Sequence, residues 1–427
     1  KVGALTGQIG SSYLWQNLLK PFRSIDFHQR ELLDAHIRNA LRMVESSAEL
    51  RGAFTKLVQM LSMRDDLFPV EALEVLSAVR ASAPPMPYRL IRQQVIRSLG
   101  KPPERVFASF ERDAFAAASL GQVHRAELRS GEPVVVKIQY PGIRDTVEQD
   151  LRNIEALLQV LTRIARDVMR QPLDTAMIYR ELEERLTEEL DYRKEAAHIA
   201  LFRTLFADDP EIEIPAVFDA ESAEHVLTMS RIDGYPLADV LIPGVDQELK
   251  DWVAIKYFRT LCRQLFHFGI LHTDPHPGNY VVTHHPKLGI LDFGSIRVFP
   301  EELRRSYLAL ARALIERDRE ALVAACRALD FLGDGDSPKA MREILETLLE
   351  PLLADRDYDP AEYRSLDKAV EVATVAFEGR LFRAPGHRVF LVRALVGLEA
   401  YVKQLGTVAN WRRIFLSEID AAPPRRE

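Results

Sequence analysis

The sequence predicts a two-lobed α+β fold with a helical N-terminal extension. Three features of the 427-residue chain indicate it: a helical pattern at the start, a short β-rich segment from Ala114, and an almost entirely helical part beyond Gly234. A mostly β lobe followed by a mostly α lobe is a stable layered arrangement, and ligands commonly bind between two lobes. We expect the extension at residues 1–108, the β-rich lobe at 109–234 and the helical lobe at 235–427.

The extension is predicted from apolar residues at three-to-four spacing, namely Leu32, Leu33, Ile37, Leu41 and Val44. Prolines in "ASAPPMPYR" (81–89) and "GKPPER" (100–105) interrupt its helices. A short apolar stripe near the start fits docking against another helix or subunit, or contact with a membrane surface. Its residues are Leu14, Trp15, Leu18 and Leu19.

The β-rich lobe is predicted from short runs joined by the turn "RSGE", with "PVVVKIQ" (133–139) as a clear strand. Helical patterns follow at about 143–169 and 174–206, and strands are expected at "IPAVFDA" (214–220) and "HVLTMS" (225–230). In the helical lobe, "YVV" (280–282) and "LGILDFG" (288–294) are short enough to form a hairpin.

Charge and cysteine content exclude several classes of protein. The chain has 63 acidic and 56 basic residues and a formal net charge of -7, without a basic face that would suit nucleic acid. Its two cysteines, Cys262 and Cys326, are too few and too far apart for a disulfide framework or a zinc knuckle. No apolar run reaches the roughly 18 residues of a membrane span. We expect a cytoplasmic protein or one peripheral to the inner face of a membrane, and an upstream targeting segment stays open because the sequence starts at Lys1.

The stretch "LHTDPHPGNYVV" (271–282) carries the candidate chemistry. His272, Asp274 and Asn279 precede the tripeptide "DFG", which begins at Asp292, in the order and spacing of a kinase catalytic loop and metal loop. Transfer of a terminal phosphoryl group requires Mg²⁺, which prefers carboxylate and amide oxygens, so we expect Asn279 and Asp292 to hold the metal. Asp274 is expected to orient or deprotonate the attacking hydroxyl or water, or only to organise the loop.

Upstream residues complete a predicted site for ATP or ADP. Lys137, near the end of a strand, is expected to hold the α and β phosphates and to pair with a glutamate. The segment "AAASLGQV" keeps the spacing of the phosphate loop G-x-G-x-x-G-x-V but has alanine at two glycine positions, which should stiffen it. The expected nucleotide contacts are Ala116, Ala117, Ala118, Ser119, Leu120, Gly121, Gln122, Val123 and Lys137, with a hinge around Met229 and Arg231 for adenine.

Each of these motifs is weak alone, and their joint order predicts a kinase-like nucleotide site. Taken together, they resemble the UbiB family of atypical protein-kinase-like ATPases, also called the ADCK family. The matching segments are "AAASLGQVHRAELRSGEPVVVKIQYPGI", "EELDYRKEA", "LHTDPHPGNYVV" and "ILDFGSI", and the likeness covers about residues 50–330. It implies a protein-kinase-like fold, use of ATP and Mg²⁺, and a role in ubiquinone biosynthesis or lipid homeostasis at membranes, with a lipid or quinone precursor as a partner.

The resemblance also assigns a regulatory role to the extension, whose K-x-G-Q motif covers the active site in the family. Here Lys56 and Gln59 match, but Val58 replaces the glycine. A β-branched residue cannot adopt a glycine conformation at positive φ, so the loop differs or the autoinhibition is relaxed. A solvated helix lysine is the alternative for Lys56.

The family's E-x-D motif falls on Glu189 and Asp191. We expect Glu195 to pair with Lys137, with Glu189 as the second choice, because Asp191 and Glu195 are four apart and would share a helix face. Glu189 or Asp191 would then engage Lys56. Lys137, Glu195 and Asp274 are the predicted catalytic residues.

Other functions fit the sequence less well. Pro275 and Pro277 prevent a helix that would align His272 and His276 on a metal, while His284 and His285 are expected in an exposed hairpin turn. A true protein kinase is disfavoured because no A-P-E motif or long activation segment follows Gly294, so a small molecule, a lipid or water is the expected acceptor. A pseudokinase scaffold that binds nucleotide stays an alternative, and the oligomeric state stays open.

Overall fold

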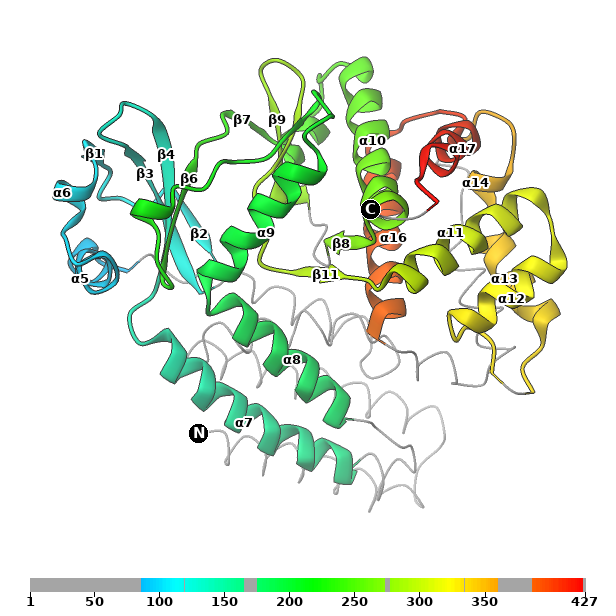
Figure 1. The fold of residues 1–427 in the computed structure, drawn as a ribbon, viewed down its shortest axis with the longest axis horizontal. Helices are drawn as coiled ribbons and strands as arrows, with labels where there is room; N and C mark the ends of the chain where they lie inside the picture. Colours follow the sequence, from blue (N-terminus) through cyan, green and yellow to red (C-terminus); the bar gives the residue numbers. More distant parts are fainter. Residues whose placement is uncertain are drawn as a thin grey trace, which may run out of the picture. The chain divides into compact units, whose positions relative to one another are not determined.

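The computed structural model describes residues 86–118, 120–164, 175–272, 277–333, 335–359 and 386–424 (Figure 1). The chain forms two compact units. The first runs to Ala196 and takes in Val217–Ser230, and the second comprises Ala197–Ala216 and the chain from Arg231 onward. Most of the predicted extension, including Lys56 and Gln59, lies outside the described residues.

The first unit contains an antiparallel sheet of five strands: β1 (Ser109–Phe110), β2 (Ala116–Ala118), β3 (Gly121–Glu127), β4 (Pro133–Gln139) and β6 (Val226–Ser230). The strands run in the order β1-β3-β4-β6, and β2 pairs with β3. Along β4, Val134, Val136 and Ile138 are fully buried and alternate with less buried residues, as expected for a strand with one face on a core. The strand predicted at 133–139 is therefore confirmed.

The prediction of a strand at 214–220 is wrong. That segment contributes a single bridge, from Val217 to Met229, and continues into the short 3-10 helix η4 (Asp219–Glu221). Pro215 lacks a backbone N–H and cannot donate to a strand ladder. The regular pairing lies just before it, in β5 (Ile212–Glu213) of the second unit.

The helices of the first unit are α5 (Tyr88–Leu99), α6 (Pro103–Val106), α7 (Ile143–Ile164) and α8 (Thr175–Glu189). Helix α5 packs against β4 and β6, with Ile91 and Val95 on its fully buried face, one turn apart. The continuous helix expected at 174–206 is instead two helices, α8 and α9 (Tyr192–Leu205), with a break at residues 190–191.

The second unit holds two small sheets. One has the order β5-β10-β9-β7, with β7 (Gly234–Pro236), β9 (Tyr280–Thr283) and β10 (Leu288–Ile290). The other pairs β8 (Ile270–His272) with β11 (Ile296–Val298). The predicted hairpin is confirmed, since β9 and β10 pair antiparallel, and His284 and His285 lie exposed in its turn.

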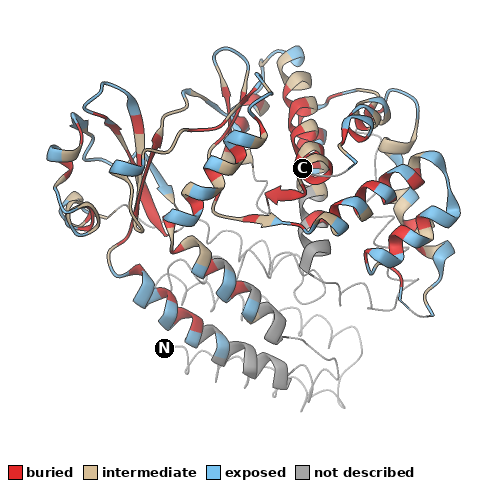
Figure 2. Cartoon of the chain, in the orientation of Figure 1, coloured by how far each residue is buried: buried red, intermediate tan, exposed pale blue. Residues whose placement is uncertain are grey.

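Helices make up the rest of the second unit. They are η5 (Leu237–Leu241), α10 (Gln247–Cys262) with its π-helical continuation η6 (Arg263–Phe268), α11 (Glu301–Glu316), α12 (Arg319–Ala328), α13 (Pro338–Leu348), α14 (Glu350–Leu353), α16 (Gly386–Leu405) and α17 (Trp411–Ala421). Buried and exposed residues alternate along α11 at helical spacing (Figure 2). Helix α10 packs on α17 through Phe258, whose ring lies 5.4 Å from that of Trp411.

Both cysteines are buried and free in this unit. Burial raises the pKa of the Cys326 thiol to about 11 and raises the pKa of the Cys262 thiol well above its usual value. Among the described helices, none is both long and apolar enough to cross a membrane.

Candidate functional site

The strand lysine predicted to contact phosphate pairs with a carboxylate of the first unit. The ammonium of Lys137 on β4 donates to both carboxylate oxygens of Glu195 on α9, each at 2.8 Å. The two side chains are 14% and 5% exposed. The ring of Tyr192 lies 5.1 Å from the same ammonium. A carboxylate buried this far must be paired, and here its partner keeps some access to solvent.

The break between α8 and α9 separates the two acidic residues of the E-x-D motif, Glu189 and Asp191. Asp191 lies in the connection, and its Oδ1 accepts a hydrogen bond from the backbone N–H of Arg193 at 2.9 Å. This is the bond of an N-cap residue, so Asp191 is the N-cap of α9. Glu189 ends α8, and its backbone oxygen accepts from Gln139 Nε2 at 3.2 Å.

The predicted phosphate loop is a tight hairpin of β2 and β3. Ala118, the last residue of β2, pairs with Gly121, the first residue of β3. Ser119 is outside the described residues, and Leu120 is buried. A Cβ atom on Gly121 would overlap the backbone oxygen of Ile138 on β4, so glycine is needed here for close packing of two strands.

Other residues of this hairpin differ in what their side chains contact. Ala116 and Ala117 are exposed, and Ala118 and Val123 are half-buried. Gln122 is buried, where its Oε1 accepts from the backbone N–H of Met86 at 2.8 Å and its Nε2 donates to His124 Nε2 at 2.9 Å. Burial lowers the pKa of His124, which fits a neutral ring that accepts at Nε2 and donates from Nδ1 to Glu111 O. The side chain of Gln122 therefore supports the sheet.

The predicted metal residues lie in the second unit, at one end of the β9–β10 hairpin. Asn279 ends the 3-10 helix η7 (Pro277–Asn279) and precedes β9, while Asp292 follows β10. Because Tyr280 pairs with Ile290, and Leu291 N–H donates to Asn279 O at 2.9 Å, the chain brings these two positions to the same edge. Asp274, the predicted catalytic acid or base, lies outside the described residues.

Two histidines hold the "DFG" backbone. His272 Nε2 donates to the backbone oxygen of Asp292 at 2.8 Å, and His198 Nδ1 donates to the backbone oxygen of Phe293 at 2.9 Å. Asp292 Oδ1 in turn accepts from Gly294 N–H at 2.9 Å, and the Phe293 ring is fully buried. These contacts fix the direction of the Asp292 side chain.

Sequence reasoning missed His198 and Gln264. Gln264 is buried on η6, and its Oε1 accepts from the backbone N–H of His272 at 2.9 Å, which anchors the start of the predicted catalytic loop. His198 follows Glu195 by three positions and so shares its helix face, a spacing from which its proximity to the site could have been inferred. Gln264 carried no comparable signal.

A bound Mg²⁺ would fit the donor set of Asn279 and Asp292. Among the residues that the structure describes, no group of three or more His, Cys, Asp or Glu side chains forms a metal cluster. Magnesium in nucleotide sites does not need one, since it keeps several waters and uses one or two protein oxygens together with phosphate oxygens. An amide and a carboxylate oxygen at one edge meet that requirement.

The predicted hinge coincides with the passage of the chain between units. Met229 is buried in β6, opposite Val135, and Ser230 is the last residue of the first unit. Arg231 opens the second unit and forms an ion pair with Asp233, with Nε 2.8 Å from Oδ1. The contact of these residues with adenine stays a prediction.

Comparisons with known proteins give a consistent result. The ABC1 atypical kinase-like domain matches residues 78–326. The chain is 34% identical to the mitochondrial atypical kinase COQ8B of Rattus norvegicus over 367 residues, which cover 84% of this chain and 68% of that protein. It is 29% identical to the mitochondrial atypical kinase COQ8 of Saccharomyces cerevisiae over 95% of this chain and 78% of the relative.

Two further matches extend the same pattern. The chloroplastic protein ACTIVITY OF BC1 COMPLEX KINASE 3 of Arabidopsis thaliana is 32% identical over 88% of this chain, which spans only 52% of that relative. Among solved structures, the complex of Rv3197 with erythromycin from Mycobacterium tuberculosis matches with a TM-score of 0.63 and 27% identity. That match covers 92% of this chain and 97% of that one.

Proposed function

The chain belongs to the ABC1 atypical kinase-like (UbiB) family, and from this premise we propose that it binds ATP with Mg²⁺ and cleaves or transfers the terminal phosphoryl group. The fold is the kinase-like α+β fold of that family. The acceptor that we propose is a small molecule, a lipid or water, in isoprenoid-quinone or lipid metabolism, the context that the family resemblance implies.

The contact between Lys137 and Glu195 is the main support for this proposal. A half-buried ion pair is a poor means of stabilising a fold, because desolvation of both charges offsets much of their attraction. An ammonium held on a strand by one carboxylate is instead suited to contact an incoming polyphosphate. The Lys137 side chain is 14% exposed, so it keeps some access to solvent.

The metal would be held by Asn279 and Asp292. Both residues flank β9 and β10, and the histidine contacts to the Asp292 and Phe293 carbonyls keep that edge in place. When bound, Mg²⁺ supplies positive charge against the phosphate oxygens. Asp274 would orient or accept the proton of the attacking hydroxyl or water.

The short segment after "DFG" supports a non-protein acceptor. Only Ser295 separates Gly294 from β11, and α11 begins at Glu301. Strand β11 pairs with β8 along its whole length, so the chain moves directly into the helical part of the unit. A long activation segment that docks peptides has no place in this stretch of the described chain.

The test is magnesium-dependent ATP turnover by the purified chain and by Asp292→Asn. We expect the variant to lose at least about tenfold in turnover, because a neutral amide binds a hard cation less well than a carboxylate. Asp239→Asn, at an exposed position of η5 in the same unit, is the matched control and should retain activity. Absence of nucleotide binding to the unaltered chain would overturn the proposal, and binding with no turnover would favour the pseudokinase scaffold.

A further inference from the structure

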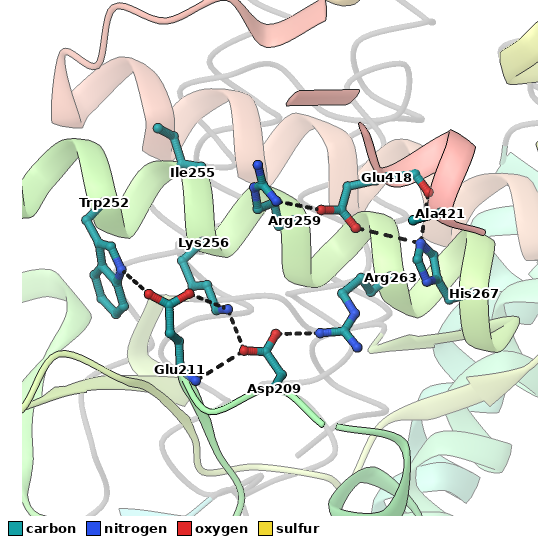
Figure 3. A pocket seen from close by; sticks show the side chains of 10 residues that line it. All are labelled: Asp209, Glu211, Trp252, Ile255, Lys256, Arg259, Arg263, His267, Glu418 and Ala421. Atoms are coloured by element: carbon teal, nitrogen blue, oxygen red, sulfur yellow. Dashed lines mark hydrogen bonds and ion pairs between the residues drawn. The ribbon is translucent and has the colours of Figure 1, made fainter. Parts of the chain in front are cut away.

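A charged cavity of about 500 Å³ lies in the second unit, between α10 with η6, the residues just before β5, and α17 (Figure 3). None of its lining residues is among those proposed to bind nucleotide or metal. Its walls carry three basic and three acidic side chains together with His267 and Trp252. The basic residues are Lys256, Arg259 and Arg263, and the acidic residues are Asp209, Glu211 and Glu418.

Asp209 is the centre of one half of this cluster. Its Oδ1 accepts from the Lys256 ammonium at 2.7 Å, and its Oδ2 accepts from Arg263 Nη1. Lys256 and Asp209 are only 8% and 9% exposed at the side chain. Glu211 completes this half, with Oε2 3.0 Å from the same ammonium and Oε1 accepting from the indole N–H of Trp252 at 3.1 Å.

Glu418, carried by α17, forms the other half. Its Oε1 accepts from Arg259 Nη1 at 3.1 Å, and its Oε2 lies 3.6 Å from His267 Nε2. Burial raises the pKa of Glu418 and lowers that of His267, so the imidazole is held toward its neutral form. The His267 ring also donates to the backbone oxygen of Glu418 at 2.9 Å.

Both arginines of the cluster keep guanidinium donors that no described residue accepts. Each oxygen of its three carboxylates already faces a nitrogen within 4 Å, as the distances above show. A guanidinium has five N–H donors in a fixed fork, yet Arg259 and Arg263 each use only Nη1 toward the described residues of this cluster. The remaining donors of both have no acceptor among the described residues and are open to water or to a ligand.

The side chains of Arg259 and Arg263 are both partly exposed, and contacts with two aromatic rings hold Arg263 in position. Arg259 is 42% exposed and Arg263 is 21% exposed at the side chain. Arg263 lies over two aromatic rings, with its guanidinium carbon 5.3 Å from the ring centre of Phe206 and 5.6 Å from that of Phe268. Such contacts limit the motion of a long side chain, so less rotamer entropy is lost when a ligand binds.

We propose that this cavity is an anion site for a phosphate monoester, bound by the unused guanidinium edges of Arg259 and Arg263. A dianionic phosphate offers three terminal oxygens and matches two guanidinium forks. Trp252 and Ile255 line the same cavity and would contact the organic part of the ligand. The site is independent of the proposed nucleotide site.

Glycerol phosphate, titrated at constant ionic strength, is the probe, and the fluorescence of Trp252 is the local reporter. We expect a saturable change that disappears in Trp252→Phe. The affinity should fall about tenfold or more in Arg259→Gln, because a charge-assisted hydrogen bond is lost. Lys250→Gln removes one positive charge from the same helix outside the cavity and should shift the affinity by no more than about twofold. Arg259→Gln is preferred to Arg263→Gln because Arg259 is the more exposed side chain, at 42% against 21%.

A lipid headgroup carries the same phosphate chemistry, so a second arm replaces glycerol phosphate with vesicles containing phosphatidic acid. Saturable binding of either probe that weakens in Arg259→Gln supports the site. The probe that binds shows whether the phosphate belongs to a soluble ester or to a lipid headgroup. No saturable change in the unaltered protein, or equal affinity in Arg259→Gln, overturns it. Asp292→Asn should bind the probe normally, which separates failure of this site from failure of the proposed ATP site.

Discussion

Lys137 and Glu195 are 58 positions apart in the sequence and are joined by two hydrogen bonds of 2.8 Å. The carboxylate lies in the first turn of α9 because Asp191 caps that helix just before it. The cap thus sets where the helix begins, and the helix sets which glutamate reaches the strand lysine.

Glu195→Gln should lower ATP turnover by about tenfold or more, because the amide no longer holds the ammonium with a full charge. Steady-state kinetics with Mg-ATP measure the effect. The control is Glu148→Gln, at an exposed position of α7. Unchanged turnover in Glu195→Gln would contradict a role of the pair in catalysis.

Ala118→Gly should tighten ATP binding. Ala118 lies at the end of β2, paired with Gly121 at the start of β3, and removal of its methyl group allows closer approach of a phosphate to the backbone. Isothermal titration with ATP and Mg²⁺ measures the affinity. The same change at Ala126, a buried β3 position away from the turn, should leave the affinity unaltered. Equal affinity of Ala118→Gly and the unaltered protein would count against the hairpin as a phosphate loop.

Gly121→Ala should destabilise the first unit by about 1–3 kcal/mol, since the new methyl group overlaps the Ile138 carbonyl of the neighbouring strand. Gly397→Ala is the contrasting variant. It lies within α16 with nothing near its Cβ position, so it should stabilise its helix by up to about 1 kcal/mol. Urea unfolding of both variants compares the two, and a stable Gly121→Ala protein would show that β3 and β4 are less closely packed.

His272→Ala should raise the Mg²⁺ concentration needed for half-maximal turnover. The imidazole holds the Asp292 carbonyl at 2.8 Å, and its loss leaves the carboxylate proposed to bind the metal less well positioned. A magnesium titration of ATP turnover measures this shift. His285→Ala, in the exposed turn after β9, should behave like the unaltered protein. A reduced maximal rate with no change in magnesium dependence would place His272 in another role.

Asp150→Asn should make the protein more stable at pH 8 than the unaltered chain. Burial raises the pKa of Asp150 to about 7, and its Oδ2 has no hydrogen-bond partner among the described residues. The folded state therefore binds a proton that the unfolded state releases, and stability falls as pH rises from about 4 to 7. Urea unfolding at pH 4 and at pH 8 tests this. The advantage of the variant should shrink at pH 4, where Asp150 is protonated in the folded state and about half protonated in the unfolded state.

Local sequence patterns predicted much of the fold and the candidate site. A short β-rich run after the turn "RSGE" marked β4, the shortness of two apolar runs marked the β9–β10 hairpin, and motif spacing selected Lys137 and Asp292. The break before α9 was missed because aspartate is compatible with a helix and also caps one, and only the structure shows which role Asp191 takes. The prediction of a strand near Pro215 is wrong because it relied on the apolar residues of the segment, although the proline has no backbone N–H to donate to a strand.

Residues joined only by tertiary structure could not be found in this way. Asp209 and Lys256 are 47 positions apart, and no spacing rule connects them. The close approach at Gly121 depends on the register of β3 against β4, which fixes Ile138 opposite Gln122. Sequence pattern identifies which residue types are present, and register decides which of them touch.

Because Cys262 and Cys326 are buried, alkylation of their thiols is a direct measure of local unfolding in the second unit. Alkylating reagents attack the thiolate, and both burial and a raised pKa keep that form scarce while the second unit is folded. The rate of labelling would then count how often α10 or α12 separates from its neighbours, with no probe added to the protein.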